Sequence, residues 1–364
     1  MAVEPVRPEY DGACISNVVR ALRGREPWVP DVIRDADSVV LLVIDGLGWN
    51  LIDTHREAMP TLAALEGGPI TSVTPSTTTA ALTSLTTGMA PVEHGVVGYR
   101  LCIDGEVLNV LRWSMPWGRP PPRPDAFQPR LAFGGEAIPV VTRADFASTG
   151  FSGLHLRGAA LHGWHGVSSI AVHCRDLVGA GERFVYAYYG YADIVFHMHG
   201  LDDNFLVAEL AFVDRLVQDV LESLPASTAL AVTADHGHIR FEEWVDLDDD
   251  VQQLVGVQAG EARFRYLHAR PGCVDDLLTA TNERYADRAW VLSRDRLIDE
   301  GWLGPRTPTA EVARRIGDVV LAARDPIGFV DPANPGETRL RSGHGSLTPD
   351  EMLVPLLATR GAHP

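Results

Sequence analysis

The chain contains no lysine, so all 31 of its basic side chains are arginines. A clamp for a phosphate group would therefore have to use arginine, histidine, a metal ion or backbone N–H groups. Cysteine is also sparse: Cys14, Cys102, Cys174 and Cys273 show no CxxC spacing, which excludes a zinc knuckle and a dense disulfide framework. No run approaches about 20 apolar residues, so we predict no membrane span.

The charge balance narrows the class of partner. Acidic residues number 48 against 31 basic ones, and the formal net charge is -17. Nucleic acids and anionic membranes are bound through cationic patches, so we expect neither a nucleic-acid scaffold nor a membrane as a partner. The negative charge also agrees with a site that concentrates divalent metals. The opening residues, MAVEPVRPEYDG, lack the basic segment and apolar core of a signal peptide, so a cytoplasmic location is expected.

Three apolar runs each lead into an acidic residue. They are Ser38–Ile44 before Asp45, Phe184–Tyr189 before Asp193, and Ala229–Ala234 before Asp235. Continuous runs of this kind are typical of strands buried on both faces of a sheet that helices cover. Ligands of such sheets bind at the carboxyl ends of the strands, so the pattern predicts a metal cluster at one edge. The alternative for each acid is an ordinary cap of the next helix.

Histidines stand near two of these acids. Asp193 and His197 are four residues apart, which places them on one face of a helical turn; the spacing suits two ligands of one metal, or an ordinary surface pair. His236 directly follows Asp235, and the glycine after it permits the turn that both need to reach one ion. His344 lies between two glycines, where packing gives little reason for a histidine, and this favours a ligand.

The stretch Ser72–Gly88, SVTPSTTTAALTSLTTG, predicts a loop that delivers a hydroxyl to the first turn of a helix. Ser76, Thr77 and Thr78 are residue types that cap helix starts, and the apolar residues after them give the helix a buried face before a glycine stop. The positive end of the helix dipole attracts anions such as phosphate. The stretch therefore either places a nucleophile at the start of the helix or is an ordinary capped helix.

Two segments interrupt this pattern. Residues 100–135 contain two tryptophans and a proline run, which predict an insertion that forms either a cap over a pocket or a surface loop. Residues 255–300 predict a small α/β lobe, with a strand over 263–269, a helix over 273–282 and a strand over 289–292. A further strand is expected over 315–321. We therefore predict a single catalytic domain over residues 1–364 that carries a cap insertion and this lobe.

The order of these pieces resembles the alkaline phosphatase superfamily, and within it the nucleotide pyrophosphatase/phosphodiesterase (type I phosphodiesterase) family. The matching motifs are VIDGLG around Asp45, PSTTTAALTSLTTG around Thr78, DIVFHMHG, ADHGH and SGHG. They span Asp45 to His344, nearly the whole chain. The resemblance implies an α/β fold, namely an alkaline phosphatase-like α/β/α sandwich with a largely parallel central sheet and a small inserted lobe.

The resemblance also implies a two-metal hydrolase of phosphodiester or pyrophosphate bonds, whose partner would be a small-molecule phosphate ester or nucleotide substrate. By position, Thr78 matches the nucleophile, which would form a phospho-threonine intermediate. The implied ligands of one ion are Asp193, His197 and His344, and those of the second are Asp45, Asp235 and His236 with the oxygen of Thr78. Zinc prefers this mixture of imidazole and carboxylate, and Mn2+ accepts the same ligand types. Two ions about 4 Å apart would clamp both oxygens of an in-line displacement.

Two positions depart from the family pattern. The diesterase group often has an Asn three residues after the nucleophile, where this chain has Ala81, so another donor must replace it. Phosphatases with a third, magnesium site carry a Glu five residues before the Asp of the DxxxH pair, where this chain has Tyr188; the missing carboxylate favours diesters or pyrophosphates over monoesters. A phosphomonoesterase, a manganese phosphomutase-like relative and a non-catalytic metal-binding relative are the alternatives. For His199 and His238 we expect surface or supporting roles.

Overall fold

The computed structural model describes residues 3–363, and its centre is a seven-stranded sheet in the order β2-β17-β8-β1-β7-β5-β6. The strands are β1 (Ser38–Ile44), β2 (Glu66–Thr71), β5 (Pro139–Arg143), β6 (Ala160–Trp164), β7 (Phe184–Tyr189), β8 (Thr228–Thr233) and β17 (Leu353–Arg360). β1 pairs in parallel with β7 and β8, and β5 with β6 and β7, whereas β17 is antiparallel to β2 and β8. The largely parallel sheet predicted from the sequence is confirmed.

The register of the three central strands brings their carboxyl ends level. β1, β7 and β8 are buried along their whole length, as expected for parallel strands covered on both faces. Ile44 of β1 pairs with Tyr189 of β7, and Val43 of β1 pairs with Thr233 of β8. Because the strands are parallel and end together, the residues that follow them leave the sheet at the same edge.

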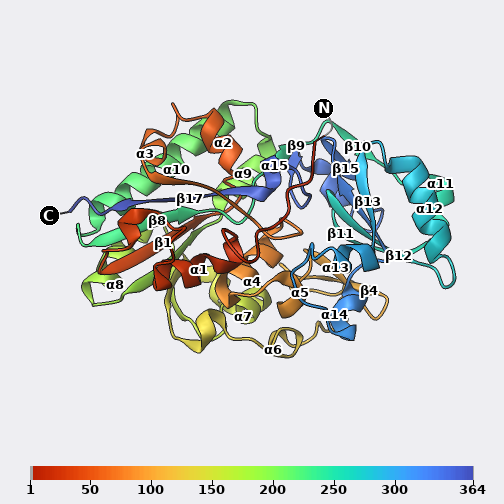
Figure 1. Cartoon of the computed structure of the whole chain (residues 1–364), viewed down its shortest axis with the longest axis horizontal. Coiled ribbons are helices and arrows are strands. Elements are labelled where there is room, and N and C mark those ends of the chain that lie inside the picture. The colour runs from red at the N-terminus through yellow and green to blue at the C-terminus, as the bar shows by residue number, and fades with distance from the viewer. Residues whose placement is uncertain (1–2, 364) are drawn as a thin grey trace.

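Helices cover both faces of this sheet, which completes the predicted α/β/α sandwich (Figure 1). One face carries α1 (Ile15–Gly24), α4 (Thr78–Thr87) and α7 (Gly150–His155). The other carries α2 (Trp49–Thr54), α3 (Pro60–Ala63), α8 (Ser169–Gly179), α9 (Tyr191–His199) and α10 (Asn204–Ser223). α10 packs against α3, α8 and α9, and the carboxylate of Asp203 caps its start by accepting from two backbone N–H groups.

A second, antiparallel sheet forms a lobe at one end of the molecule, on the right in Figure 1. It has the order β11-β12-β14-β13, with β11 (Val255–Glu261), β12 (Phe264–Ala269), β13 (Ala289–Ser293) and β14 (Val319–Ala323), and α11 (Asp249–Gln252) and α12 (Val274–Tyr285) lie beside it. Leu277, Tyr285 and Val319 belong to a separate hydrophobic core. The fourth strand lies beyond residue 300, outside the segment that we predicted as a lobe.

The strand expected over 315–321 is wrong in its position. Residues Ala310–Arg315 form the helix α14, and β14 starts only at Val319. The reason is local: the hydroxyl of Thr309 accepts a hydrogen bond from the backbone N–H of Val312 at 3.3 Å, and this cap starts a helix ahead of the strand.

Short elements join the sandwich to the lobe. Residues 100–135 hold a hairpin of β3 (Arg100–Ile103) and β4 (Glu106–Asn109), followed by α6 (Pro124–Phe127). The remaining elements are α5 (Pro91–His94), β9 (Ile239–Arg240), β10 (Glu243–Val245), α13 (Arg294–Asp299), β15 (Ile327–Phe329), β16 (Ser342–Gly343) and α15 (Pro349–Met352). β9 pairs with β16, and β10 pairs with β15. The division into a catalytic domain, a cap and a lobe stays a prediction.

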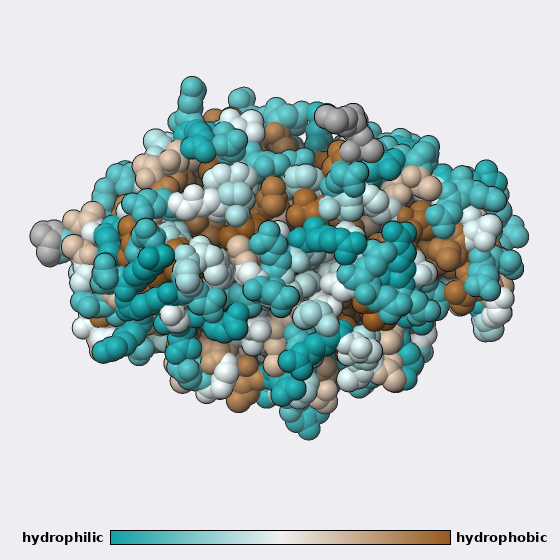
Figure 2. Space-filling model, in the orientation of Figure 1, coloured by the Kyte–Doolittle hydropathy of each residue, from teal (hydrophilic) through white to brown (hydrophobic). Residues whose placement is uncertain are grey.

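The face shown in Figure 2 is mostly hydrophilic, with small hydrophobic areas scattered over it. Within residues 3–363, none of the helices combines the length and the apolar composition that crossing a bilayer requires.

Candidate metal centre

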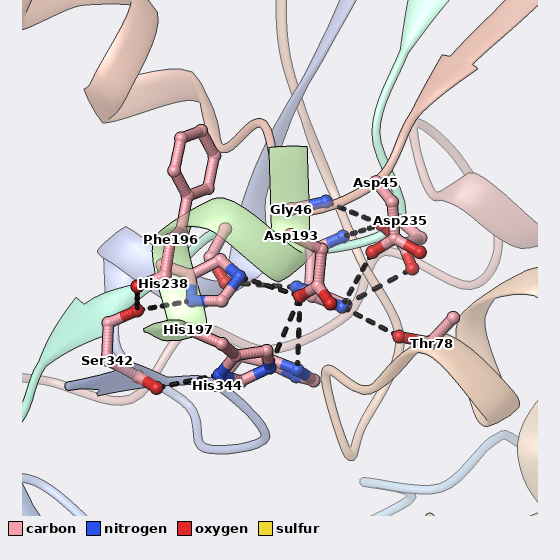
Figure 3. A network of polar contacts seen from close by, with 12 residues as sticks. Asp45, Gly46, Thr78, Asp193, Phe196, His197, Asp235, His238, Ser342 and His344 are labelled. Atoms are coloured by element: carbon pink, nitrogen blue, oxygen red, sulfur yellow. Dashed lines mark hydrogen bonds and ion pairs between the residues drawn. The ribbon is translucent and has the colours of Figure 1, made fainter. Parts of the chain in front are cut away.

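The structure brings all seven predicted site residues together at the carboxyl edge of the central sheet (Figure 3). Asp45 follows β1, Asp235 and His236 follow β8, Asp193 and His197 lie on α9, His344 follows β16, and Thr78 is the first residue of α4. The backbone is closely packed there: a Cβ on Gly237 would lie 2.0 Å from the backbone oxygen of Asp350. The close approach of these two segments therefore requires glycine at position 237.

Three imidazoles gather around Asp193 and form the first group. Oδ1 of Asp193 lies 2.9 Å from Nε2 of His238, 3.3 Å from Nε2 of His197 and 3.8 Å from Nε2 of His344. One carboxylate with several imidazole nitrogens is a donor set typical of zinc sites.

His236 is the centre of the second group. Its Nε2 atom lies 3.4 Å from Oδ1 of Asp45, 3.3 Å from Oδ2 of Asp235 and 3.1 Å from Oγ1 of Thr78. The rings of His236 and His344 stack with their centroids 3.5 Å apart, so the two groups are direct neighbours.

The hydrogen bonds of the imidazoles indicate which ring nitrogen carries the proton. Nδ1 of His197, His236 and His344 each lies within 2.7–3.1 Å of a backbone carbonyl oxygen. Since a carbonyl only accepts, Nδ1 is the donor in each neutral ring and the lone pair is on Nε2. Three Nε2 lone pairs therefore point toward the carboxylates, which is the arrangement that supports metal ligation.

Two buried carboxylate oxygens show whether a cation fits beside His236. Oδ1 of Asp45 and Oδ2 of Asp235 have no hydrogen-bond partner among the described residues, although both side chains are almost fully buried. Burying an unpaired carboxylate is strongly unfavourable, and lone pairs facing one another repel. A divalent cation beside these oxygens and the Nε2 atom of His236 would satisfy all of them, so the residues of the second group fit a metal ion.

The pKa values of the site residues are also shifted by burial and by the neighbouring charges. Burial raises the pKa of Asp45 well above its usual value, and the negative charges of Asp235 and Asp193 raise it further. Burial also raises the pKa of Asp235. The pKa of Asp193 is instead held well below its usual range, because His197, His238 and His344 outweigh the effect of its burial. Burial, with the other imidazoles, holds the pKa of His344 far below normal; its ring is therefore neutral and able to ligate.

His238 is closer to the site than the sequence indicated. Its side chain is fully buried, its Nε2 contacts Asp193 as described, and its Nδ1 lies 3.1 Å from Oγ of Ser342. Burial lowers the pKa of His238 to about 3. The sequence signal that could have placed His238 at the site is its position two residues after His236, with a glycine between them. His199, by contrast, stacks on the exposed ring of Phe205 at a centroid distance of 3.8 Å.

Thr78 occupies the predicted place at the start of α4, which ends at Gly88 with a φ of 70°. The predicted side-chain cap is wrong, because no hydroxyl caps this helix. The hydroxyls have other partners: Ser76 donates to the carbonyl of Ser346 at 2.8 Å, and Thr78 contacts His236. The nucleophile candidate thus points away from its own helix and into the site.

The two departures from the family pattern have structural counterparts. Ala81 is fully buried in the main hydrophobic core, so position 81 offers no donor to the site. Tyr99, Asn109 and Arg112 line a cavity together with Thr78. These side chains carry hydrogen-bond donors that could replace the Asn expected at position 81. Tyr188 donates a hydrogen bond to Oδ2 of Asp45, a contact that sequence reasoning missed.

Comparisons with known proteins agree with this geometry. The sequence profile of the family described as Type I phosphodiesterase / nucleotide pyrophosphatase matches residues 39–347, and curated protein sequences give no match. Human ectonucleotide pyrophosphatase / phosphodiesterase 5 is 13% identical with a TM-score of 0.67, covering 88% of this chain and 87% of that chain. The murine protein is 14% identical with a TM-score of 0.66 and the same coverage.

A bacterial structure is similar to the same degree. Phosphonoacetate hydrolase from Sinorhizobium meliloti 1021, solved in complex with phosphonoacetate, is 17% identical with a TM-score of 0.65, covering 92% of this chain and 91% of that chain. At such identities the structural likeness establishes the fold, and the family rests on the sequence profile, which covers every motif from Asp45 to His344. The chain therefore belongs to the type I phosphodiesterase / nucleotide pyrophosphatase family of the alkaline phosphatase superfamily, which places it among the phosphoester hydrolases.

Proposed function

We propose that the chain is a two-metal hydrolase that cleaves phosphodiester or pyrophosphate bonds through a covalent phospho-threonine on Thr78. The observation that carries the proposal is the place of the Thr78 hydroxyl, 3.1 Å from Nε2 of His236, where the two groups of carboxylates and imidazoles meet. The hydrolase chemistry of the family supports the same reading.

Each group would hold one ion. Asp193, His197 and His344 are the proposed ligands of the first, and Asp45, Asp235 and His236 those of the second. Zinc suits both donor sets, with manganese as the alternative. When bound, the pair supplies positive charge to the attacking and the departing oxygens of an in-line displacement.

Thr78 supplies the attacking oxygen. The bond from its Oγ1 to phosphorus forms while the bond from phosphorus to the leaving oxygen breaks; the leaving oxygen keeps the bonding electron pair, and the hydroxyl proton passes to solvent water. The backbone N–H groups of the first turn of α4 have no intrahelical partner, so they would hold the charged phosphoryl oxygens at the positive end of the helix. Water then cleaves the bond between Oγ1 and phosphorus, which frees Thr78 and releases a phosphate monoester.

The test compares bis(p-nitrophenyl) phosphate, p-nitrophenyl phosphate and a nucleotide pyrophosphate, using metal-free protein supplied with zinc or manganese. We expect faster cleavage of the diester than of the monoester, about two zinc ions per chain, and a lower melting temperature after chelation. Phosphonoacetate, the ligand of a structural neighbour, is added as an alternative substrate. A faster monoester rate would support the phosphomonoesterase instead, and full metal content without turnover would support the non-catalytic relative.

A further inference from the structure

Two cavities of different character open beside Thr78. The smaller has a volume of about 190 Å³ and a largely apolar wall that includes Leu82, Phe146, Phe151 and Ile194. The larger, of about 380 Å³, has a wall that is more polar than that of the smaller one and includes Tyr99, Asn109, Arg112 and Glu261. Thr78, Leu111 and Asp193 line both, so a phosphorus atom at Thr78 would face both cavities.

The side chains at each cavity indicate which part of a diester it would hold. Asp45 lines the smaller cavity, whereas His197 and His344 line the larger one. In an in-line displacement the leaving oxygen departs on the side opposite Thr78, and the proposed function places the group of His197 and His344 at that oxygen. The larger, polar cavity would then take the leaving group, and the smaller, apolar cavity the ester group that stays on phosphorus.

Two of the polar side chains that line the smaller cavity, Thr149 and His155, are already engaged within the chain. Oγ1 of Thr149 donates to the carbonyl of Phe146 at 3.0 Å and accepts from the backbone N–H of Ser152 at 3.1 Å. Nδ1 of His155 lies 2.8 Å from the carbonyl of Phe151. Thr149 and His155 therefore offer little hydrogen-bonding capacity to a polar guest such as a sugar, whereas the hydroxyl of Tyr186 has no hydrogen-bond partner among the described residues. Because the rest of the wall is largely apolar, a guest that loses no hydrogen bonds to water is favoured.

The size of the cavity limits the guest further. A cavity of about 150 Å³ lined by apolar side chains holds a benzene ring. A volume of about 190 Å³ therefore accommodates one ring or a short branched alkyl group, whereas a base together with its ribose would extend beyond it.

We propose that the substrate is a phosphodiester whose retained ester group is a single aromatic ring or a compact alkyl group, bound in the smaller cavity, and that nucleoside esters are disfavoured there. The inference rests on the proposed function and narrows its substrate class. Chemically, the P–O bond to the leaving group breaks as the bond from Oγ1 of Thr78 to phosphorus forms, and the aryl or alkyl phosphate monoester is released by water.

The experiment keeps the leaving group constant and varies the retained group. The zinc-loaded protein is given the p-nitrophenyl esters of methyl, phenyl and 1-naphthyl phosphate and of thymidine 5′-phosphate, all of which release p-nitrophenolate. We expect kcat/KM for the phenyl ester to exceed that of the methyl ester at least about tenfold, because pocket contacts of one to a few carbons have effects of this size. The naphthyl and thymidine esters should fall below the phenyl ester by a similar factor.

Two variants test the cavity itself. Thr142 lines it from β5 and is 3% exposed, so Thr142→Leu fills space and should remove most of the phenyl advantage relative to the methyl ester. Thr142→Val, which has the same shape as threonine, is the matched control and should keep the advantage. Phe146→Ala enlarges the cavity from a half-buried position and should raise kcat/KM for the naphthyl ester.

The outcomes separate the two proposals. A thymidine ester cleaved faster than the phenyl ester, or a ranking that neither Thr142→Leu nor Phe146→Ala changes, overturns this inference and leaves the proposed function standing. Cleavage of none of the four diesters by the zinc-loaded protein overturns the proposed function itself.

Discussion

The hydroxyl of Tyr188 donates a hydrogen bond to Oδ2 of Asp45 inside the protein. The other oxygen of Asp45, Oδ1, faces Nε2 of His236 and has no hydrogen-bond partner among the described residues. The tyrosine therefore fixes the carboxylate so that its free oxygen points toward the proposed second ion. Hydrogen bonds to ligating carboxylates set their orientation and their affinity for the metal.

Tyr188→Phe should weaken binding of the second zinc ion by about 10-fold to 100-fold, with a smaller effect on the first. Competition against a chelator of known affinity measures both constants. The matched control is Tyr186→Phe, two residues earlier on the same strand, because the hydroxyl of Tyr186 makes no hydrogen bond within residues 3–363. Equal zinc affinities in the two variants would contradict the role assigned to Tyr188.

Thr78→Ala should lower kcat by at least about 10⁴-fold, because loss of a nucleophile removes most of the catalysis of a covalent route. Metal content should change little, since six other side chains contribute to the two groups. Rapid-quench labelling with a radioactive diester should show a phospho-protein with the native chain and none with the variant. Thr87→Ala, in the last turn of the same helix, is the control and should keep full activity; a Thr78→Ala protein of equal activity would exclude the covalent route.

Glu351 connects two of the loops that carry site histidines. Its fully buried carboxylate is held by the guanidinium of Arg263 at 2.7 and 2.9 Å and accepts from the backbone N–H of Ser346 at 2.9 Å. Its backbone oxygen accepts from the N–H of Gly237, also at 2.9 Å. Ser346 follows His344 by two residues and Gly237 follows His236 directly, so one residue anchors both loops.

Glu351→Ala should destabilise the protein by about 3–5 kcal/mol, because it leaves the Arg263 charge buried without its partner, and it should also weaken zinc binding. Glu351→Gln, which keeps an acceptor for Ser346, should retain more of both. Asp318→Ala is the control: Asp318 pairs with Arg294 at 2.7 Å and accepts from the N–H of Ala269 at 2.8 Å inside the lobe. That variant should lower the melting temperature and leave zinc affinity unchanged, as measured by calorimetry and metal competition.

The parts of the fold that the sequence predicted well are those with a local cause. The runs Ser38–Ile44 and Phe184–Tyr189 coincide with β1 and β7, because six consecutive apolar residues are stable only where both faces of a strand are buried. An acid placed just after such a run is fixed at the edge of the sheet. The meeting of Asp45, Asp193 and Asp235 follows from these local features and from the parallel pairing.

What the sequence did not reveal depends on pairings between distant segments. β17 comes from the end of the chain and lies antiparallel between β2 and β8, a position that no local pattern specifies. Tyr188 appears as one more apolar residue of a buried strand, and Glu351 as an ordinary residue of a turn after a proline. Their hydrogen bonds to other segments, which no periodicity encodes, give them their importance.

The last prediction concerns Glu261 and the pH dependence of the free energy of unfolding. Its side chain is 7% exposed at the end of β11; Oε2 accepts from the N–H of Tyr99 at 3.1 Å, and Oε1 has no hydrogen-bond partner in the described part of the chain. Burial raises the pKa of Glu261 to about 8, and the charge of Glu337 adds to this, while the Tyr99 N–H and the guanidiniums of Arg265 and Arg100 act in the opposite direction.

Because the pKa of Glu261 is higher in the folded chain than its ordinary value of 4.5, its contribution to stability is complete below about pH 4.5 and is lost as the pH rises through about 8. The loss is on the order of 1 kcal/mol per pH unit within that window. Glu261→Gln keeps the acceptor for Tyr99 but cannot ionise, so it should gain stability over the native chain steadily from pH 5.5 to about 8 and level off above that. Urea midpoints of the metal-free proteins measure the difference. Glu57→Gln, at an exposed position, should show no such trend, and a difference between Glu261→Gln and the native chain that is independent of pH would mean that Glu261 is ionised in the fold.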